Sequence, residues 1–379
     1  MNTIDTTYAG HSVGFRVSES PVFVPQKFKN KLLEACDKIF HTISQPDFKA
    51  QTDAAIEPSQ FVPGEEGQSL FMQLDFGVCT DEHGELTPQL IEIQGFPSLY
   101  FFQTLLADAY RKHFETIPAD FITMFGGLDA AGYVEILRQA IVGKHAPKDV
   151  ILLEIEPEKQ STGIDFYITE ALLGVKVLCL SQLKKDGKIL YHLGENGERI
   201  VVKRIYNRVI FDELLKRNDL HREFDFQDDV DVEWAGHPNW FFRISKYTLP
   251  LLAENNPFVP PTRFLHTIEK YPEDLENYVL KPLFSFAGMG VKINVTRQDL
   301  DEVQDRKNYI LQKKVHYAPV IETPTGAAKC EIRMMAVWLP DTPKPLIINN
   351  ICRMSKGEMV GVRYNKDKDW VGGTVCFFE

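Results

Sequence analysis

The sequence predicts an α/β protein with more than one lobe. Strand-like and helical segments alternate along the 379 residues, and a strand-helix-strand unit near the middle is typical of a parallel sheet. With 44% apolar and 25% charged residues, the composition is that of an ordinary soluble protein. The length suffices for two or three lobes and a sizeable core.

The charge excludes one large class of function. The formal net charge is -11 and the isoelectric point is about 5.5. A general nucleic-acid binder needs a broad excess of Lys and Arg to neutralise phosphates, so nucleic acid is not expected as a partner. A smaller anion must therefore meet a local cluster of basic side chains.

The cysteines and the start of the chain favour a cytoplasmic protein without a membrane partner. The cysteines are scattered, with no Cys-x-x-Cys pair or closely spaced histidine, which predicts reduced thiols rather than a zinc site or a disulfide framework. The start of the chain lacks a basic segment followed by an apolar run, and no stretch is long enough to span a bilayer. The six cysteines are Cys36, Cys79, Cys179, Cys330, Cys352 and Cys376.

The first part of the chain, residues 1–145, is expected to hold a helix, a hairpin and further helices. Apolar side chains recur at helical spacing in residues 28–44, which predicts a helix that faces the core. Residues 69–78 and 88–96 predict the strands of a hairpin around an acidic turn, and residues 99–143 predict at least two helices. The apolar positions of the first helix are Leu32, Leu33, Cys36, Ile39 and Phe40.

Residues 146–235 are expected to form a lobe of their own. The segments 149–157, 163–174 and 175–180 read as strand, helix and strand, which indicates a parallel sheet. The acidic segment 223–233 is the expected linker.

Residues 236–379 are expected to be mostly strands after one helix. Residues 239–254 predict the helix, and prolines make residues 258–265 extended. Residues 278–295 read as a strand, a glycine turn and a second strand. Further strands are expected at 309–315, 331–339, 345–354 and 371–379.

A lysine and a glycine-rich loop form the first candidate site. Lys281 lies on an apolar strand and is followed at once by a loop containing Ser285, Gly288 and Gly290. Glycines let backbone N–H groups approach phosphate oxygens, and a strand-anchored lysine adds a fixed positive charge. The alternative is a glycine hairpin with a solvated lysine.

Three oxygen donors on the predicted hairpin form the second candidate site. Glu92 and Gln94 lie two residues apart on a strand and point to the same face, and Asp75 on the other strand can face them. Oxygen ligands of this kind suit Mg²⁺, which also accepts water and substrate phosphates. The alternative is the polar outer face of a half-buried hairpin.

Two arginines and a glycine pair form the third candidate site. Arg333 and Arg353 lie on successive strands and can hold a carboxylate or a transferring phosphoryl group, with Gly372 and Gly373 nearby. The alternative is a surface ion pair, for example with Glu331.

Together these groups resemble the ATP-grasp superfamily, especially glutathione synthetase and D-alanine:D-alanine ligase. The resemblance implies that Lys281 and the loop with Ser285, Gly288 and Gly290 hold the phosphates of ATP. It implies an adenine-binding hinge at the end of the segment 309–315. The hinge residues are Gln312, Lys313, Lys314 and Val315.

The resemblance implies further roles. Lys246 is similar to an earlier phosphate-binding lysine of the family, and residues 146–235 resemble its Rossmann-like substrate lobe, in which Arg208 would contact the substrate. Arg333 and Arg353 would offset charge on the transferring group. Arg353 with the backbone of Gly372 and Gly373 would stabilise a tetrahedral oxyanion.

The order of these segments resembles a circularly permuted ATP-grasp domain. In the family the metal-binding strands follow the glycine pair, whereas here Asp75, Glu92 and Gln94 lie near the start of the chain. Permutation requires the segment near residue 379 to lie close to the strand before Asp75. Two positions depart from the family pattern: Gln94 stands in place of Asn, and Gln312-Lys313 replaces an acidic hinge residue.

The implied function is that of an ATP- and Mg²⁺-dependent ligase. It would activate a small-molecule carboxylate as an acyl phosphate and join it to an amine, with an amino acid or a peptide-like acid as the substrate. Three alternatives remain open: a small-molecule kinase on the same fold, a non-catalytic nucleotide-binding or interaction protein, and a generic α/β protein that matches these motifs by chance. A homodimer is the expected assembly, because dimers are common among soluble proteins.

Overall fold

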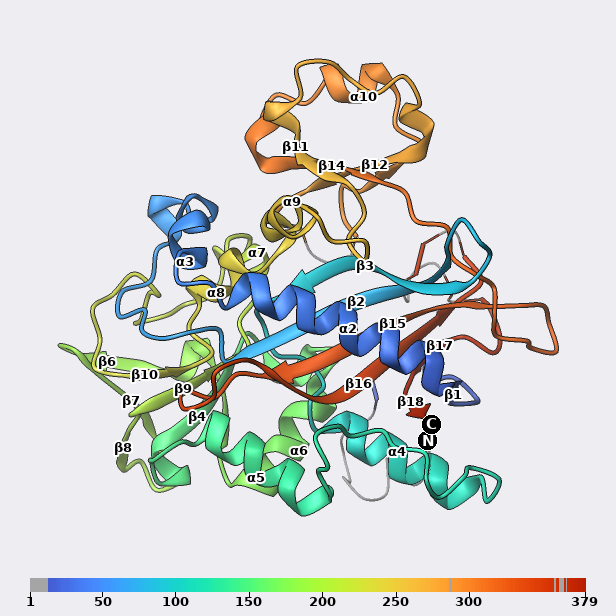
Figure 1. Cartoon of the computed structure of the whole chain (residues 1–379). Coiled ribbons are helices and arrows are strands. Elements are labelled where there is room, and N and C mark those ends of the chain that lie inside the picture. The colour runs from blue at the N-terminus through green and yellow to red at the C-terminus, as the bar shows by residue number, and fades with distance from the viewer. Residues whose placement is uncertain (1–12, 286–287, 358, 361–364, 366) are drawn as a thin grey trace.

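A five-stranded antiparallel sheet forms the centre of the molecule (Figure 1). The computed structural model describes residues 13–285, 288–357, 359–360, 365 and 367–379. Two strands of the sheet come from before residue 95 and three from after residue 328, so both ends of the chain build one sheet. In spatial order the strands are β17 (Gly372–Thr374), β16 (Leu346–Ser355), β15 (Lys329–Val337), β2 (Phe71–Thr80) and β3 (Leu86–Gln94).

Helix α2 (Gln26–Ile43) lies across one face of this sheet (Figure 1). Leu32, Cys36 and Ile39 are fully buried and belong to the same core cluster as Leu74 and Ile332 of the sheet. Burying this apolar stripe stabilises the helix on the sheet. The helix predicted at 28–44 is therefore confirmed, as is the hairpin formed by β2 and β3.

A parallel four-stranded sheet lies beside the central sheet, in the order β10, β9, β4 and β5 (Figure 1). Its strands are β10 (Glu233–Ala235), β9 (Arg204–Asn207), β4 (Val150–Glu154) and β5 (Lys176–Cys179). The helix α6 (Gly163–Leu173) connects β4 to β5, so the strand-helix-strand unit predicted there is confirmed. A small antiparallel sheet of β6 (Lys184–Asp186), β7 (Ile189–Leu193) and β8 (Arg199–Val201) adjoins it.

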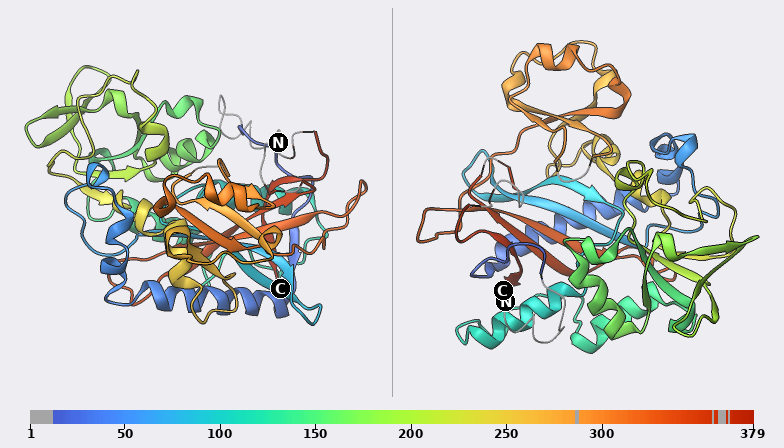
Figure 2. Two further views of the ribbon diagram at one scale, coloured as in Figure 1. Left: turned by 90° about the horizontal axis from the view of Figure 1, so that it is seen from above. Right: turned by 180° about the vertical axis from the view of Figure 1, so that it is seen from behind.

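A small antiparallel lobe stands above the central sheet in both Figure 1 and the right view of Figure 2. Its strand order is β11 (Thr262–Phe264), β14 (Tyr309–Lys313), β12 (Tyr278–Pro282) and β13 (Lys292–Ile293). The lobe has its own core, formed by Leu265, Leu280, Val295, Leu300 and Leu311.

The remaining helices cover the sheets and connect them. The helices expected within residues 99–143 are α4 (Phe102–His113) and α5 (Ala130–Ile141). The other α-helices are α3 (Phe48–Gln51), α7 (Phe211–Leu214), α8 (Asn239–Arg243), α9 (Leu249–Leu252) and α10 (Arg297–Asp301). The 3₁₀ turns are η1 (Asp53–Ala55), η2 (Pro58–Gln60), η3 (Pro147–Asp149), η4 (Pro157–Lys159), η5 (Leu180–Gln182), η6 (Lys246–Thr248), η7 (Leu265–Thr267), η8 (Leu275–Asn277) and η9 (Arg306–Asn308).

The helix predicted at 239–254 is wrong as a single element. The chain forms three short pieces, α8, η6 and α9, with extended backbone at Ser245. The carbonyl of Ile244 accepts a hydrogen bond from the backbone N–H of Gly95 instead of a helical donor. This long-range bond breaks the helix and anchors the segment to the end of β3.

The last strand returns to the beginning of the chain. β18 (Cys376–Phe378) pairs in parallel with β1 (Val22–Val24), and the N–H of Glu379 donates to the carbonyl of Val24. All six cysteines are free thiols, as predicted. Among the described residues, no helix is both long and apolar enough to cross a bilayer.

Candidate active site

The face of the central sheet opposite α2 carries polar side chains at its middle. Leu74 points toward α2, so its neighbours Gln73 and Asp75 point to the opposite face. In the sheet register, Asp75 lies opposite Glu92 on β3 and opposite Arg333 on β15. The structure thus brings together candidate residues from the two ends of the chain.

Asp75 is enclosed by two guanidinium groups. Its Oδ1 accepts a hydrogen bond from Nε of Arg333 at 2.5 Å, and its Oδ2 accepts from Nη2 of Arg333 at 2.7 Å and from Nη2 of Arg353 at 2.6 Å. The carboxylate is only 1% exposed. Burial alone would raise the pKa of Asp75, but the two arginines hold it below its ordinary value.

The two arginines differ in how many of their guanidinium nitrogens already have a protein partner. Arg333 donates from Nε and Nη2 to Asp75 and from Nη1 to the side-chain oxygen of Gln73, so all three nitrogens have protein partners. Arg353 bonds Asp75 and Glu331 through Nη2 alone, and its buried Nε has no hydrogen-bond partner within the described parts of the chain. Arg353 is therefore the arginine able to bind a ligand, and Arg333 is a positioning residue.

Tyr317 is a site residue that sequence reasoning missed. Its hydroxyl donates a hydrogen bond to Oε1 of Glu331, whose Oε2 accepts from Arg353 at 2.9 Å. Burial raises the pKa of Glu331 despite the neighbouring Arg353. The tyrosine ring lies against Gly77, where an added Cβ would come within 2.8 Å of its Cε1. Gly77, a glycine inside the strand β2, was the sequence signal for a close approach of another side chain at this position.

Two lysines approach the polar face from the side of β3. Nζ of Lys281 donates to the carbonyl of Ile91 at 3.0 Å and to Oε1 of Gln312 at 2.5 Å. The carbonyl of Ile91 is accessible because the pairing of β2 with β3 is irregular next to Asp75. Burial lowers the pKa of Lys281 to about 8. Lys246 pairs with Oε1 of Glu92 at 3.0 Å.

The glycine loop follows β12, as predicted, and part of it lies outside the described residues (286–287). The carbonyl of Ser285 accepts a hydrogen bond from Lys246 at 2.9 Å. Gly288 and Gly290 both have φ of +72°, a region that favours glycine.

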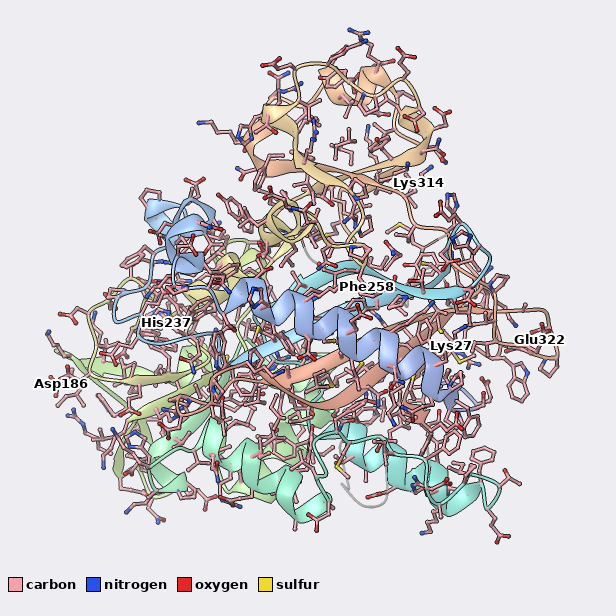
Figure 3. All side chains as sticks on the ribbon, in the orientation of Figure 1. Lys27, Asp186, His237, Phe258, Lys314 and Glu322 are labelled. Atoms are coloured by element: carbon pink, nitrogen blue, oxygen red, sulfur yellow. The ribbon has the colours of Figure 1, made fainter. Side chains whose placement is uncertain are left out.

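The expected hinge residues lie at the end of β14, but their side chains have protein partners or face solvent. Gln312 accepts from Lys281 and donates to the hydroxyl of Thr262, so its amide is occupied. Lys313 is exposed, Val315 is half-buried, and Lys314 donates to Oδ1 of Asn294 at 2.6 Å. Lys314 lies at the lower edge of the small lobe, where the chain leaves for the central sheet (Figure 3).

Arg208 is buried in the parallel-sheet lobe. Its guanidinium is held between the rings of Phe96 and Phe166, at 4.6 and 5.2 Å from their centroids. The residue is 3% exposed, yet Nε and Nη1 lack a partner among the described residues. Glu154 lies near it at the end of β4, and burial raises the pKa of Glu154 to about 8. An anionic group of a ligand would satisfy these donors.

The glycine pair has a different role from the one expected. The N–H of Gly373 donates to the carbonyl of Arg16, so it is not available to an oxyanion. An added Cβ on Gly372 would lie 2.6 Å from the same carbonyl, and one on Gly373 would lie 3.3 Å from the ring of Phe15. The glycines therefore let residues 15–18 pass along the edge of β17.

The three residues expected to bind Mg²⁺, Asp75, Glu92 and Gln94, fit that role only in part. Both oxygens of Asp75 accept hydrogen bonds from arginines, so Asp75 acts as a counter-ion in this structure, and its role as a metal ligand stays a prediction. Glu92 is 29% exposed and Gln94 is half-buried on the same face, so these two can serve a cation whose other ligands are phosphates and water. Within the described residues, no three His, Cys, Asp or Glu side chains are grouped to hold a metal.

Comparison with known proteins agrees with this arrangement at the level of the fold. No protein-family model and no curated protein sequence matches the chain. Among solved structures, the chain is similar to a glutathione synthetase-like effector from Globodera pallida, solved in its apo form. The TM-score is 0.58 and the identity 12%, over 96% of this chain and 90% of that one. The chain therefore has an α/β fold similar to that of a glutathione synthetase-like protein.

Proposed function

We propose that this chain is an ATP- and Mg²⁺-dependent ligase of the ATP-grasp type, which joins a small-molecule carboxylate to an amine. One observation carries the proposal: cationic side chains from separate lobes meet at one polar face, where the buried Nε of Arg353 has no partner among the described residues. Within the same described residues, Arg208 of the parallel-sheet lobe also has buried donors without partners. Buried donors are normally satisfied, so the site is suited to an anion.

The charge balance of this face supports an anionic ligand. Four cationic side chains, Lys246, Lys281, Arg333 and Arg353, gather here with three carboxylates, those of Asp75, Glu92 and Glu331, in a chain whose net charge is -11. The excess is local, as a phosphate site in an acidic protein requires. The glycine loop beside Lys246 supplies backbone N–H groups for the same purpose.

The proposed reaction has two steps. A carboxylate oxygen of the substrate attacks the γ-phosphorus of ATP, and the bond from that phosphorus to the β,γ-bridging oxygen breaks, with its electron pair leaving on ADP. The amine nitrogen then attacks the carbonyl carbon of the acyl phosphate, the carbon–oxygen bond to phosphate breaks, and the amine proton passes to solvent. Phosphate leaves.

Each charged group would have a defined task. Lys281 and Lys246 would contact phosphate oxygens, and Arg353, held by Asp75 and Glu331, would offset charge on the transferring group. Glu92 and Gln94 would hold Mg²⁺, which supplies electrostatic stabilisation of the phosphate oxygens. Arg208 would anchor an anionic group of the acid substrate.

The parallel pairing of β18 with β1 supports a circularly permuted ATP-grasp domain. Permutation demands that the segment near residue 379 lie close to the strand preceding β2. The hydrogen bond from the N–H of Glu379 to the carbonyl of Val24 supports this part of the proposal.

Hydroxylamine trapping tests the proposed function. The protein is incubated with ATP, Mg²⁺ and a panel of amino acids and short peptides, with hydroxylamine in place of the amine. An acyl phosphate yields a hydroxamate and ADP in equal amounts, and Lys281→Met and Arg353→Met should each lower the rate by at least about 100-fold. ADP release without hydroxamate, with a phosphorylated hydroxyl as product, would identify a kinase instead.

A non-catalytic nucleotide-binding protein is the second candidate. It is favoured by the double ion pair of Asp75, which leaves only Glu92 and Gln94 for a metal. Binding of an ATP analogue without ADP formation on any acid of the panel would support it.

A further inference from the structure

Lys246 is presented to the site by a segment that is anchored to β3. The N–H of Gly95 donates to the carbonyl of Ile244 at 2.7 Å, and an added Cβ on Gly95 would lie 2.3 Å from the carbonyl oxygen of Trp240. Ser245 begins the η6 turn, with its hydroxyl accepting from the N–H of Tyr247 at 3.1 Å. The backbone of Lys246 therefore has little freedom beside Glu92.

The ammonium of Lys246 joins two parts of the site. It pairs with Oε1 of Glu92 on the central sheet at 3.0 Å and donates to the carbonyl of Ser285, at the start of the glycine loop, at 2.9 Å. Both acceptors, a carboxylate oxygen and a carbonyl oxygen, are of the kind that also bind divalent metal ions. The lysine thus holds the place beside Glu92 that a divalent ion would take.

The other lysine does not share this role. Lys281 donates to the carbonyl of Ile91 and to Gln312, and neither acceptor is a carboxylate. Asp75, which lies opposite Glu92 in the pairing of β2 with β3, is bound by Arg333 and Arg353. Lys246 is therefore the cation that competes with a metal for the carboxylate of Glu92.

We propose that Lys246 fills the cation position at Glu92 in the nucleotide-free protein, so that a divalent metal enters only together with a nucleotide. This inference rests on the proposed function. The phosphates of the nucleotide offer Lys246 acceptors that carry more negative charge than Glu92, and its ammonium moves to them. Glu92 is then released to the metal that accompanies the phosphates. The lysine thus prevents a metal from binding at Glu92 until a nucleotide is bound.

Manganese binding tests this inference without measuring turnover. Electron paramagnetic resonance reports free Mn²⁺, in the presence and absence of the non-hydrolysable analogue AMP-PNP. The wild-type protein should bind Mn²⁺ at this site only when AMP-PNP is present. Lys246→Met removes the competing ammonium, so it should bind Mn²⁺ without nucleotide about tenfold or more tightly than the wild type.

Three comparisons make the result decisive. Lys246→Arg retains a cation and should keep Mn²⁺ out as the wild type does, while Glu92→Gln in the Lys246→Met background should abolish the gain. Lys270→Met removes a lysine that is 88% exposed in the small lobe and should change nothing. Equal Mn²⁺ affinity of wild type and Lys246→Met, or a wild type that binds Mn²⁺ as tightly without AMP-PNP as with it, would overturn the inference. If the wild type bound no AMP-PNP at all, the proposed function itself would fail.

Discussion

Asp75 and Glu92 are neighbours on one face, but their surroundings assign them different tasks. Asp75 neutralises two guanidinium groups and is almost fully buried, whereas Glu92 is partly exposed and bound to one lysine. A carboxylate enclosed by arginines contributes to the folded structure, and a partly exposed carboxylate is available for a ligand.

Substituting these two residues should separate stability from binding. Asp75→Asn leaves Arg333 without a counter-ion and Arg353 with Glu331 alone, and it should lower the free energy of unfolding by about 3 kcal/mol. Glu92→Gln should lower it by about 1 kcal/mol, because Lys246 keeps the carbonyl of Ser285. Urea denaturation followed by circular dichroism measures both. Equal losses would contradict the assignment.

The buried ammonium of Lys281 predicts a pH dependence of nucleotide binding. Its pKa is about 8 in the folded protein because burial disfavours the charged form. A bound triphosphate raises this pKa, so the ammonium's contribution to affinity is complete below pH 8 and is lost as the pH rises above it. Affinity for AMP-PNP should fall by up to about tenfold per pH unit above pH 8.

Isothermal titration between pH 7 and 9.5 checks this dependence. Lys281→Met should bind AMP-PNP more weakly but with a nearly constant affinity over that range. A wild-type affinity that does not change between pH 8 and 9.5 would show that Lys281 does not contact the nucleotide.

At the scale of elements, local patterns predicted most of the fold. The apolar stripe of α2, the β2–β3 hairpin and the β4-α6-β5 unit follow from periodicity, because each buries a regular apolar face. The helix expected at 239–254 contains Pro250, a sequence signal against one continuous helix, and this proline lies in the first turn of α9. The anchoring of the segment could not be predicted, because it depends on a hydrogen bond to Gly95, which lies about 150 positions earlier in the chain.

The site was predictable in its residue types but not in its pairings. Spacing alone indicated that Glu92 and Gln94 share a face and that Lys281 precedes a glycine loop. Which cation meets Asp75 depends on the register of β2 with β15, which is a tertiary property. Tyr317 was missed because it lies outside the regular strands and its role comes from a hydrogen bond to Glu331, a tertiary contact made with its ring lying against Gly77.

A substitution at Gly372 tests whether residues 15–18 pass so close to β17 that only glycine fits there. Gly372 has φ of +135°, and an added Cβ would lie 2.6 Å from the carbonyl of Arg16. Gly64 also has a positive φ but has nothing within 4 Å of an added Cβ. Gly372→Ala should therefore lower the unfolding free energy by about 2 kcal/mol more than Gly64→Ala does. Equal losses in urea denaturation would show that the approach of residues 15–18 is not tight.

At the scale of the whole molecule, the last strand joins the two ends of the chain. Val375, Cys376, Phe377 and Phe378 are fully buried, and β18 pairs with β1. Removing residues 375–379 exposes apolar surface worth roughly 6 kcal/mol or more, a large share of the stability of an ordinary domain. Circular dichroism should show loss of cooperative unfolding, whereas removal of Glu379 alone should preserve it. A truncated protein that unfolds like the wild type would contradict this role.

The small lobe stands above the central sheet, and the parallel sheet lies beside it (Figures 1 and 2). Lys281 belongs to β12 of the small lobe, and Arg208 directly follows β9 of the parallel sheet. Lys246 and Lys281 both bond across these parts, to Ser285 and Ile91. A nucleotide bound there would contact residues from both ends of the chain.

A crystal structure with AMP-PNP and Mg²⁺ would show directly where the nucleotide binds. The triphosphate should contact Lys246 and Lys281, with Mg²⁺ on Glu92 and the γ-phosphate facing Arg353. A nucleotide bound elsewhere, with the contacts of Lys246 to Glu92 and Ser285 intact, would contradict this prediction.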